Sequence, residues 1–212
     1  LSSMSIDKHN HDEKHHHRSD IGDKPWQAIR IEAVESLLHE IGVINSSDVD
    51  AIVHHYEEKV GPKTGARVVA KAWTDPDFKA RLLADGLEAC AELGIGGPET
   101  ERLRVVENTD TLHNVVVCTL CSCYPWPILG LPPAWYKSSA YRSRLVREPR
   151  KVLEEMGLQL TQETEVRVWD SVSEIRYLVL PQRPSASAGM SESELMDIIT
   201  RDAMIGVAKV SV

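Results

Sequence analysis

The chain has 212 residues, of which 24 are Lys or Arg and 32 are Asp or Glu, so its net charge is −8 at pH 7. Hydrophobic residues make up 42%, a balance that excludes fibrous, collagenous and wholly disordered proteins. The negative charge disfavours nucleic acid and anionic membranes as partners, and no apolar run reaches the roughly 18 residues of a membrane helix. With no apolar signal-peptide region at the polar start of the chain, we expect a cytoplasmic protein.

Residues 1–22 contain almost no apolar side chains, so we expect a disordered tail there. Five of the nine histidines of the chain lie in this tail, namely His9, His11, His15, His16 and His17. Such a tract can hold divalent metal loosely and supply it to a site elsewhere. Flexible histidines lack a fixed ligand geometry, however, and the composition favours a tail without a defined site.

Residues 23–98 are predicted to form a helical arm or a helical subdomain. Apolar residues recur there at steps of three and four, and cap residues or glycines mark the ends. The predicted helices span residues 26–41, 47–60, 62–73 and 74–94. Their apolar faces need a surface to cover, so the helices either close on one another or form an arm that wraps a partner.

Residues 99–212 show a mixed pattern of strands and helices. β-branched and aromatic residues alternate with polar ones in the predicted strands, which are 103–107, 113–118, 166–170 and 174–180. Helices are predicted at 133–147 and 149–156, then a helix begun by Ser191 and Glu194, then a closing strand at 205–212. The expected fold class is α+β, with a helical arm followed by a mixed α/β layered domain that carries most of the cysteines.

Four cysteines are unevenly spread along the chain. Cys118, Cys121 and Cys123 fall within six residues, whereas Cys90 stands alone on an apolar helical stripe, where a core residue is expected. A secreted disulfide framework would join distant cysteines, which this spacing does not allow. We therefore expect thiol or metal chemistry at the three close cysteines.

The segment VVVCTLCSCYPWP, residues 115–127, carries this chemistry. Its apolar start predicts a strand that delivers Cys118 to the end of a sheet, after which two prolines force the chain out of regular structure. A structural zinc site draws on two cysteine pairs, and no second pair is present. The backbone nitrogens of Ser122 and Cys123 are candidate ligands, which would suit a high-charge ion of square-planar or octahedral geometry.

The stretch CTLCSCYPWPILGLPPAWYKSSAYRSRLVREPRKVL, residues 118–153, resembles the metal-binding segment of the α subunit of nitrile hydratase. The resemblance continues through VRVWDS, EIRYLVLPQRP and ITRDAMIGVA, and upstream through YEEKVGP and ARVVAKAWTDP. It covers about residues 26 to 210 and is most specific at the cysteines. It implies that residues 99–212 form a metal-binding catalytic domain that would hydrate nitriles to amides.

The resemblance also implies a ligand set. Cys118, Cys121 and Cys123 match the three sulfur ligands, and the amide nitrogens of Ser122 and Cys123 match the two backbone ligands. Cys121 would be oxidised to a sulfinate and Cys123 to a sulfenate, which is plausible for metal-bound thiolates that solvent can reach. Cys123, Ser122 and Cys121 are then the expected catalytic residues. Thr119 is the residue of the cobalt members, so Co(III) is expected rather than iron.

Several partners and alternatives accompany this assignment. A separate β subunit would supply arginines that balance the oxidised sulfurs, a small nitrile would be the substrate, and an activator protein is a candidate for loading cobalt. A thiocyanate hydrolase subunit carries the same cysteine loop, but it departs from this chain at Trp126 and Leu131. A non-catalytic metal-binding or delivery module is the third hypothesis.

Other residues near the loop have less specific interpretations. Tyr124 and Trp126 either line the substrate pocket or pack beside the prolines. His113 is expected to be a hydrogen-bonded residue and not a ligand. A run of basic residues is expected to form a solvated helical face, namely Arg142, Arg144, Arg147, Arg150 and Lys151.

Overall fold

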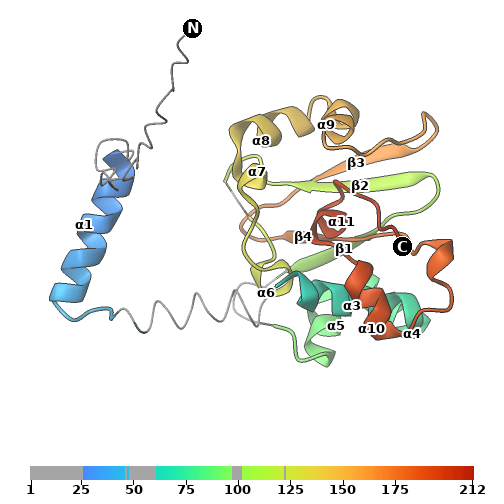
Figure 1. The fold of residues 1–212 in the computed structure, drawn as a ribbon, viewed down its shortest axis with the longest axis horizontal. Coiled ribbons are helices and arrows are strands. Elements are labelled where there is room, and N and C mark those ends of the chain that lie inside the picture. Colours follow the sequence, from blue (N-terminus) through green and yellow to red (C-terminus); the bar gives the residue numbers. More distant parts are fainter. Residues whose placement is uncertain (1–25, 46, 48–60, 97–101, 122) are drawn as a thin grey trace, which may run out of the picture. The chain divides into compact units, whose positions relative to one another are not determined.

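The computed structural model describes residues 26–45, 47, 61–96, 102–121 and 123–212 (Figure 1). The chain divides into two compact units, residues 1–49 and 50–212. The described residues form helices and small parallel sheets, which confirms the predicted α+β class. The predicted limits at 22 and 98 stay a prediction, because residues 1–25 and 97–101 lie outside the described residues.

In the first unit, helix α1 spans Trp26–Glu40. It ends as predicted at Gly42, whose φ of 72° is a left-handed conformation that favours glycine. The large apolar side chains of this helix are exposed, among them Trp26, Ile31 and Leu37. The helix therefore has an apolar surface that the described part of its own unit does not bury. Most of the predicted helix at 47–60 lies outside the described residues.

Three helices open the second unit: α3 (Pro62–Thr74), α4 (Pro76–Ala84) and α5 (Gly86–Glu92). The helix predicted at 62–73 is confirmed, whereas the single helix predicted at 74–94 is wrong. Asp85 interrupts it with an extended backbone and accepts hydrogen bonds from the amides of Leu87 and Glu88. A good N-cap inside an apolar repeat thus begins a new helix.

All four predicted strands are present, the first with the predicted ends and the others with ends shifted by at most two residues. They are β1 (Leu103–Glu107), β2 (Leu112–Val117), β3 (Glu165–Asp170) and β4 (Arg176–Leu180). β1 pairs with β4 and β2 pairs with β3, both in parallel. Val117 lies opposite Asp170 in the second pair. Cys118 and Asp170 therefore meet at one edge of the β2–β3 sheet.

Short helices connect β2 to β3. They are α6 (Trp126–Leu129), α7 (Ala134–Lys137), α8 (Ser139–Leu145) and α9 (Pro149–Glu155). The single helix predicted at 133–147 is wrong, because Ser138 leaves the helical conformation and its hydroxyl caps α8 through the amide of Tyr141. Helix α6 was not predicted. It accommodates Pro127 in its first turn, where a missing N–H costs nothing.

The chain ends in a 3-10 turn, η3 (Ser185–Ser187), and two helices, α10 (Glu192–Ile198) and α11 (Arg201–Ile205). The predicted capping box of Ser191 and Glu194 is present. The closing strand predicted at 205–212 is wrong, because α11 occupies its first residue and Gly206 follows with φ 92°. Val207 and Val210 are buried without joining a sheet.

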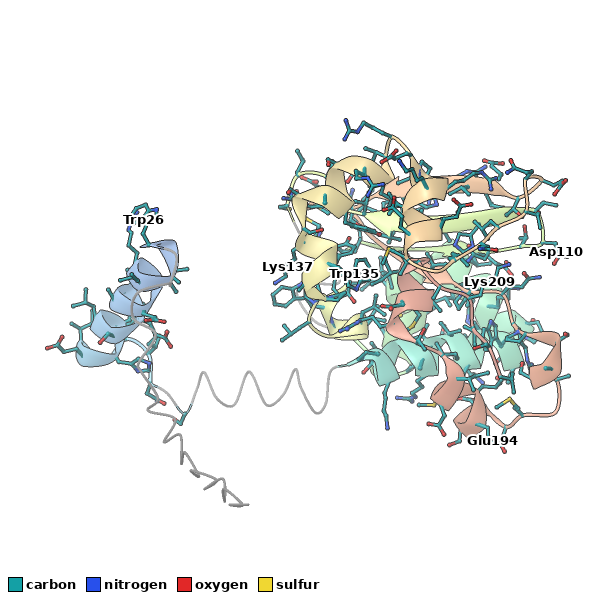
Figure 2. All side chains as sticks on the ribbon, turned by 45° about the horizontal axis from the view of Figure 1, so that its top comes forward. Trp26, Asp110, Trp135, Lys137, Glu194 and Lys209 are labelled. Atoms are coloured by element: carbon teal, nitrogen blue, oxygen red, sulfur yellow. The ribbon has the colours of Figure 1, made fainter. Side chains whose placement is uncertain are left out.

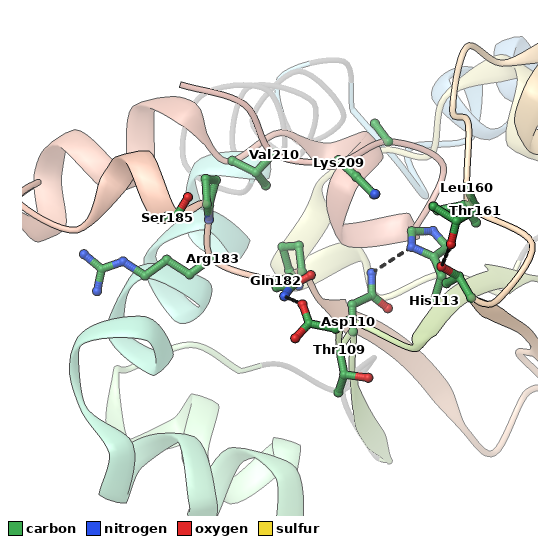
Figure 3. A pocket seen from close by; sticks show the side chains of 15 residues that line it. Thr109, Asp110, His113, Leu160, Thr161, Gln182, Arg183, Ser185, Lys209 and Val210 are labelled. Atoms are coloured by element: carbon green, nitrogen blue, oxygen red, sulfur yellow. Dashed lines mark hydrogen bonds between the residues drawn. The ribbon is translucent and has the colours of Figure 1, made fainter.

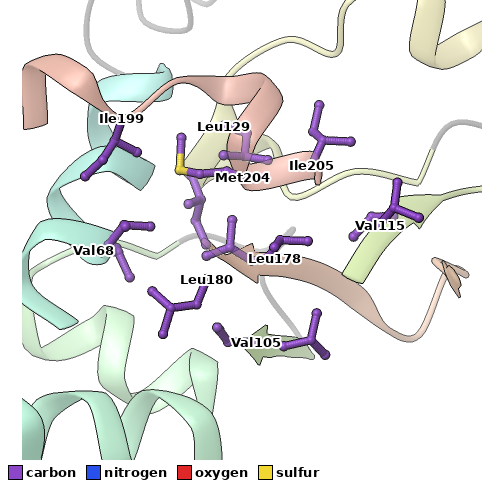
Figure 4. Packing of buried hydrophobic residues seen from close by; sticks show 14 of the residues in the cluster. Val68, Val105, Val115, Leu129, Leu178, Leu180, Ile199, Met204 and Ile205 are labelled. Atoms are coloured by element: carbon purple, nitrogen blue, oxygen red, sulfur yellow. The ribbon is translucent and has the colours of Figure 1, made fainter. Parts of the chain in front are cut away.

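One hydrophobic core joins the elements of the second unit (Figure 4). Val68 of α3 and Met204 of α11 pack around Leu178 and Leu180 of β4 in this core. Gly65 lets α3 approach closely, since a Cβ there would lie 2.7 Å from the sulfur of Met204. Among the described residues, the longest and most apolar helices still fall short of what a membrane crossing requires.

Candidate metal centre

Strand β2 delivers the cysteine loop, residues 118–123, to the sheet edge as predicted. Val115, Val116 and Val117 are buried, and Cys118 directly after them is 0% exposed. The loop then turns outward, so that Leu120 is 81% exposed and Cys121 is also exposed. A buried strand thus fixes the inner end of a loop whose tip faces solvent.

The three predicted sulfur ligands come together. The Sγ of Cys121 lies 3.4 Å from that of Cys118 and 3.3 Å from that of Cys123, and all three atoms lie within 4.8 Å of one another. This is the one such cluster of metal-binding side chains found in the described parts of the chain. Ser122 lies outside the described residues, so its backbone and side-chain roles stay predictions.

The electrostatics of the cluster favour a bound cation. Burial, and then the neighbouring sulfurs of Cys121 and Cys118, raise the pKa of the Cys123 thiol to about 12. Without an ion the Cys123 thiol therefore stays protonated, and a bound cation would be needed to stabilise three thiolates this close together. Soft sulfur donors suit a transition metal rather than magnesium or calcium. The donor set therefore fits the ion that the sequence predicts.

Thr119 is held through three of its atoms. Its amide and hydroxyl donate to the carboxylate of Asp170 at 2.9 and 2.5 Å, and its carbonyl accepts a 3.3 Å hydrogen bond from Arg142 Nη1. Sequence reasoning missed both partners. Asp170 could have been suspected as the polar residue that ends a strand parallel to β2, whereas Arg142 gave no distinguishing signal within its basic run.

The rest of the basic run forms local contacts on the surface. Arg144 pairs with Glu148 and Glu155 at 2.5 and 2.7 Å, and Arg150 donates to the carbonyl of Thr161 at 3.1 Å. The predicted solvated helical face thus describes Arg144 but not Arg142, which reaches the cysteine loop.

An aromatic cluster lies under the loop. Tyr136 donates to the carbonyl of Cys123 at 2.9 Å, and Tyr141 donates to the carbonyl of Val116 at 2.7 Å. Burial raises the pKa of both phenols, which keeps them protonated as donors. Tyr124 is buried and meets Tyr136 edge to face at 5.1 Å, so it packs in this cluster instead of facing solvent.

Cys90 and His113 have the structural roles predicted for them. Cys90 is fully buried on α5, and burial raises the pKa of its thiol to about 12. His113 is buried at the start of β2, where Nε2 donates to the carbonyl of Gly206 at 2.7 Å and Nδ1 accepts from Asn108 at 3.3 Å (Figure 3). Burial lowers the pKa of His113, which favours this neutral form.

A polar cavity of about 460 Å³ adjoins His113 (Figure 3). Asp110, Gln182 and Lys209 line it, and Gln182 donates to the carboxylate of Asp110 at 2.5 Å. The cavity lies where β2 begins, whereas the cysteine loop lies where β2 ends. The two features therefore occupy opposite ends of the same strand.

Comparison with known proteins places these features in a family. The model of the family "Nitrile hydratase, alpha chain" matches residues 26–208. A nitrile hydratase subunit alpha from Rhodococcus sp is 60% identical over 184 residues, 86% of this chain and 92% of the relative. A cobalt-containing nitrile hydratase subunit alpha from Pseudonocardia thermophila is 59% identical over 179 residues, 84% of this chain and 88% of the relative.

A solved structure agrees with the sequence comparison. An Fe-type nitrile hydratase variant from Comamonas testosteroni Ni1 superposes with a TM-score of 0.84 and 42% identity, covering 89% of this chain and 92% of that one. A thiocyanate hydrolase subunit gamma from Thiobacillus thioparus is less similar, at 46% identity over 83% of this chain and 76% of the relative. The resemblance seen at the cysteine loop therefore extends over most of the chain. The chain belongs to the nitrile hydratase alpha-chain family.

Proposed function

We propose that this chain is the metal-binding subunit of a cobalt nitrile hydratase, which converts R–CN and water to R–CO–NH2. The carrying observation is the cluster of Cys118, Cys121 and Cys123, which gathers three sulfurs within 4.8 Å in a chain of this family. A bound trivalent ion would supply Lewis-acid polarisation of the nitrile carbon. The three sulfurs and the amide nitrogens of Ser122 and Cys123 would hold it.

Cobalt is proposed over iron. Relatives named as cobalt-containing are 53–59% identical to this chain, whereas the Fe-type solved structure is 42% identical. Thr119, between the first two cysteines, is the residue that the resemblance associates with cobalt, so it supports the same metal.

Each residue of the loop has its own role in the proposed reaction. Cys121 as a sulfinate and Cys123 as a sulfenate would present oxygen atoms to the substrate, and Ser122 would hydrogen-bond to them. These groups would place the attacking oxygen beside the nitrile carbon and receive or release its proton. Asp170 and Arg142 hold Thr119 and so keep the first half of the loop from relaxing.

A second chain is part of the proposal. Oxidised sulfurs carry negative charge. Arg142 already donates to a backbone carbonyl of the loop, and the charge of Arg176 acts to lower the pKa of Cys123. A β subunit would supply the balancing arginines, and an activator protein would load the cobalt. The predicted cytoplasmic location belongs to the same proposal, and cell fractionation would test it.

Co-expression with a β subunit in cobalt-supplemented medium tests this function. Purified complex should contain one cobalt per chain, convert a small nitrile to its amide, and carry about 48 Da of added oxygen on this chain, for three oxygen atoms. Three unmodified thiols with reversibly bound zinc and no amide would instead identify a metal-delivery module.

Thiocyanate hydrolysis is the second candidate, supported by the relative at 46% identity. The same complex should be assayed with thiocyanate at matched concentrations. Faster turnover of thiocyanate than of every nitrile tested would replace the first proposal by the second.

A further inference from the structure

Tyr136 contacts the backbone of the last cysteine of the loop. Its side chain is 0% exposed, and its hydroxyl donates to the carbonyl of Cys123 at 2.9 Å across thirteen residues of sequence. The Sγ of Cys123 in turn lies 3.3 Å from that of Cys121. A shift of this carbonyl would therefore move one side of the sulfur cluster.

The chain around Cys123 depends on a side chain for such support. Residues 123–125 belong to neither helix nor strand, and Pro125 has no N–H to donate. Leaving a buried carbonyl without a hydrogen bond costs free energy. In β2 the paired strand supplies these hydrogen bonds, whereas at Cys123 the hydroxyl of Tyr136 supplies one.

The ring of Tyr136 is itself held in place. It meets Tyr124 edge to face at 5.1 Å, Trp135 at 6.1 Å and Tyr141 at 5.8 Å. Close packing of rings leaves one rotamer for the side chain, so its hydroxyl is a fixed point. Figure 2 shows Trp135 and Lys137, the neighbours of Tyr136 on α7, on one side of the unit.

We infer that Tyr136 is a positioning residue of the metal centre: its hydroxyl fixes the carbonyl of Cys123 and thereby the place of that cysteine in the ligand set. The inference rests on the proposed function, since it concerns the same centre. It assigns to α7 a role that the cysteine motif alone does not contain.

Tyr141 provides a matched control. It belongs to the same aromatic cluster, is 6% exposed, and donates to a backbone carbonyl at 2.7 Å. That carbonyl belongs to Val116 inside β2, two residues before the first cysteine. Tyr136→Phe and Tyr141→Phe therefore each remove one buried phenol hydroxyl from one backbone carbonyl, and only the first removes it from a cysteine. Tyr136→Phe also removes the hydroxyl from the side chain of Ser171.

The experiment uses the cobalt-loaded complex with the β subunit. We expect Tyr136→Phe to shift the sulfur-to-metal charge-transfer absorption and to lower kcat by about 10- to 100-fold with little change in KM. Tyr141→Phe should lower the thermal midpoint to a similar extent while leaving the absorption and kcat near those of the parent. Equal spectral shifts in both variants, or none in Tyr136→Phe, would overturn the inference.

Two further arms keep the outcome decisive. If the parent complex binds cobalt but hydrates no nitrile, the proposed function fails, whereas the absorption of Tyr136→Phe still tests the positioning role. If Tyr136→Phe does not fold, 3-fluorotyrosine at position 136 strengthens the donor without emptying the site. The charge-transfer band should then shift for position 136 and not for 3-fluorotyrosine at 141, and the opposite pattern would refute the role of Tyr136.

Discussion

The two ends of strand β2 carry opposite kinds of polar chemistry. Where the strand begins, each side-chain nitrogen and oxygen of the buried residues His113, Asn114 and Asn108 has a partner within the protein. Asn108 accepts from the amide of Asn114 at 2.7 Å, and Trp169 donates to the side chain of Asn114 at 2.8 Å. Asp110, next to this end, and Trp135, next to the cysteine end, lie on opposite sides of the unit (Figure 2).

Where the strand ends, three sulfurs lie close to one another. Cys118, Cys121 and Cys123 lie within reach of a single ion, and the loop around them is fixed through its backbone by Asp170, Arg142 and Tyr136. Residue type alone therefore does not decide which group binds metal. His113 has the chemistry of a ligand, but both of its nitrogens already serve the fold.

Removing a sulfur from the cysteine end should have the largest effect on activity. We expect Cys118→Ser to abolish cobalt binding and to lower amide formation about 1000-fold or more, because the Lewis-acid contribution of several kcal/mol is lost. Elemental analysis and an amide assay measure this. Cys90→Ala is the control, since that thiol is buried outside the cluster. Cobalt retained by Cys118→Ser at the parent level would contradict the ligand assignment.

A change at the other end should instead damage the fold. In Gly206→Ala the new Cβ would collide with the carbonyl of Asn114, at a residue whose φ of 92° already disfavours a side chain. We expect a loss of about 2 to 5 kcal/mol in the free energy of unfolding. Gly189→Ala, where nothing lies within 4 Å, should change it by well under about 1 kcal/mol. Urea unfolding compares the two, and equal midpoints would argue against the close approach.

Asp170→Asn probes the support of the loop without touching a sulfur. The substitution removes the charge and one of the two oxygens that accept hydrogen bonds from Thr119, and we expect cobalt affinity or kcat to fall about 10- to 100-fold. Asp110→Asn is a matched exchange at the far end of β2 and should leave both unchanged. Competition with a chelator measures the affinity. An effect of equal size in both variants would show that the location of the carboxylate does not matter.

The titration of His113 should give the smallest effect. Its pKa is lowered in the folded chain by burial, and Lys209 lowers it further while the bond to Gly206 opposes the shift. The unfolded chain therefore takes up the proton first, and stability should fall as the pH drops below about 6.5, by at most about 1.4 kcal/mol per pH unit. His113→Gln should lack this part of the pH dependence in urea unfolding between pH 8 and 5.5. An unchanged slope would assign it to other groups.

Local patterns in the sequence predicted much of the fold. Alternation identified β1 to β4, and the box of Ser191 and Glu194 identified the start of α10. The errors arose where one residue redirected a pattern that otherwise continued. Asp85 and Ser138 lie inside apolar repeats and cap a new helix there, and periodicity does not reveal which polar residue takes that role.

The candidate site, like the fold, could be predicted only in part. The spacing of Cys118, Cys121 and Cys123 was enough to predict a shared metal site, because such close residues share one loop. Asp170 and Tyr136 contact that loop from 51 and 13 residues away in sequence. Contacts of this kind depend on strand pairing and helix placement, which no local pattern contains.

The differing burial of the three sulfurs has a kinetic consequence. Cys118 is buried, Cys123 is partly covered and Cys121 faces solvent, so an arriving ion would exchange its water for Cys121 first and for Cys118 last. Departure has to follow the reverse order, so the bond to Cys118 would break first, and an acid or chelator in solution cannot reach that buried bond. Such one-sided access favours retention of the ion over rapid exchange.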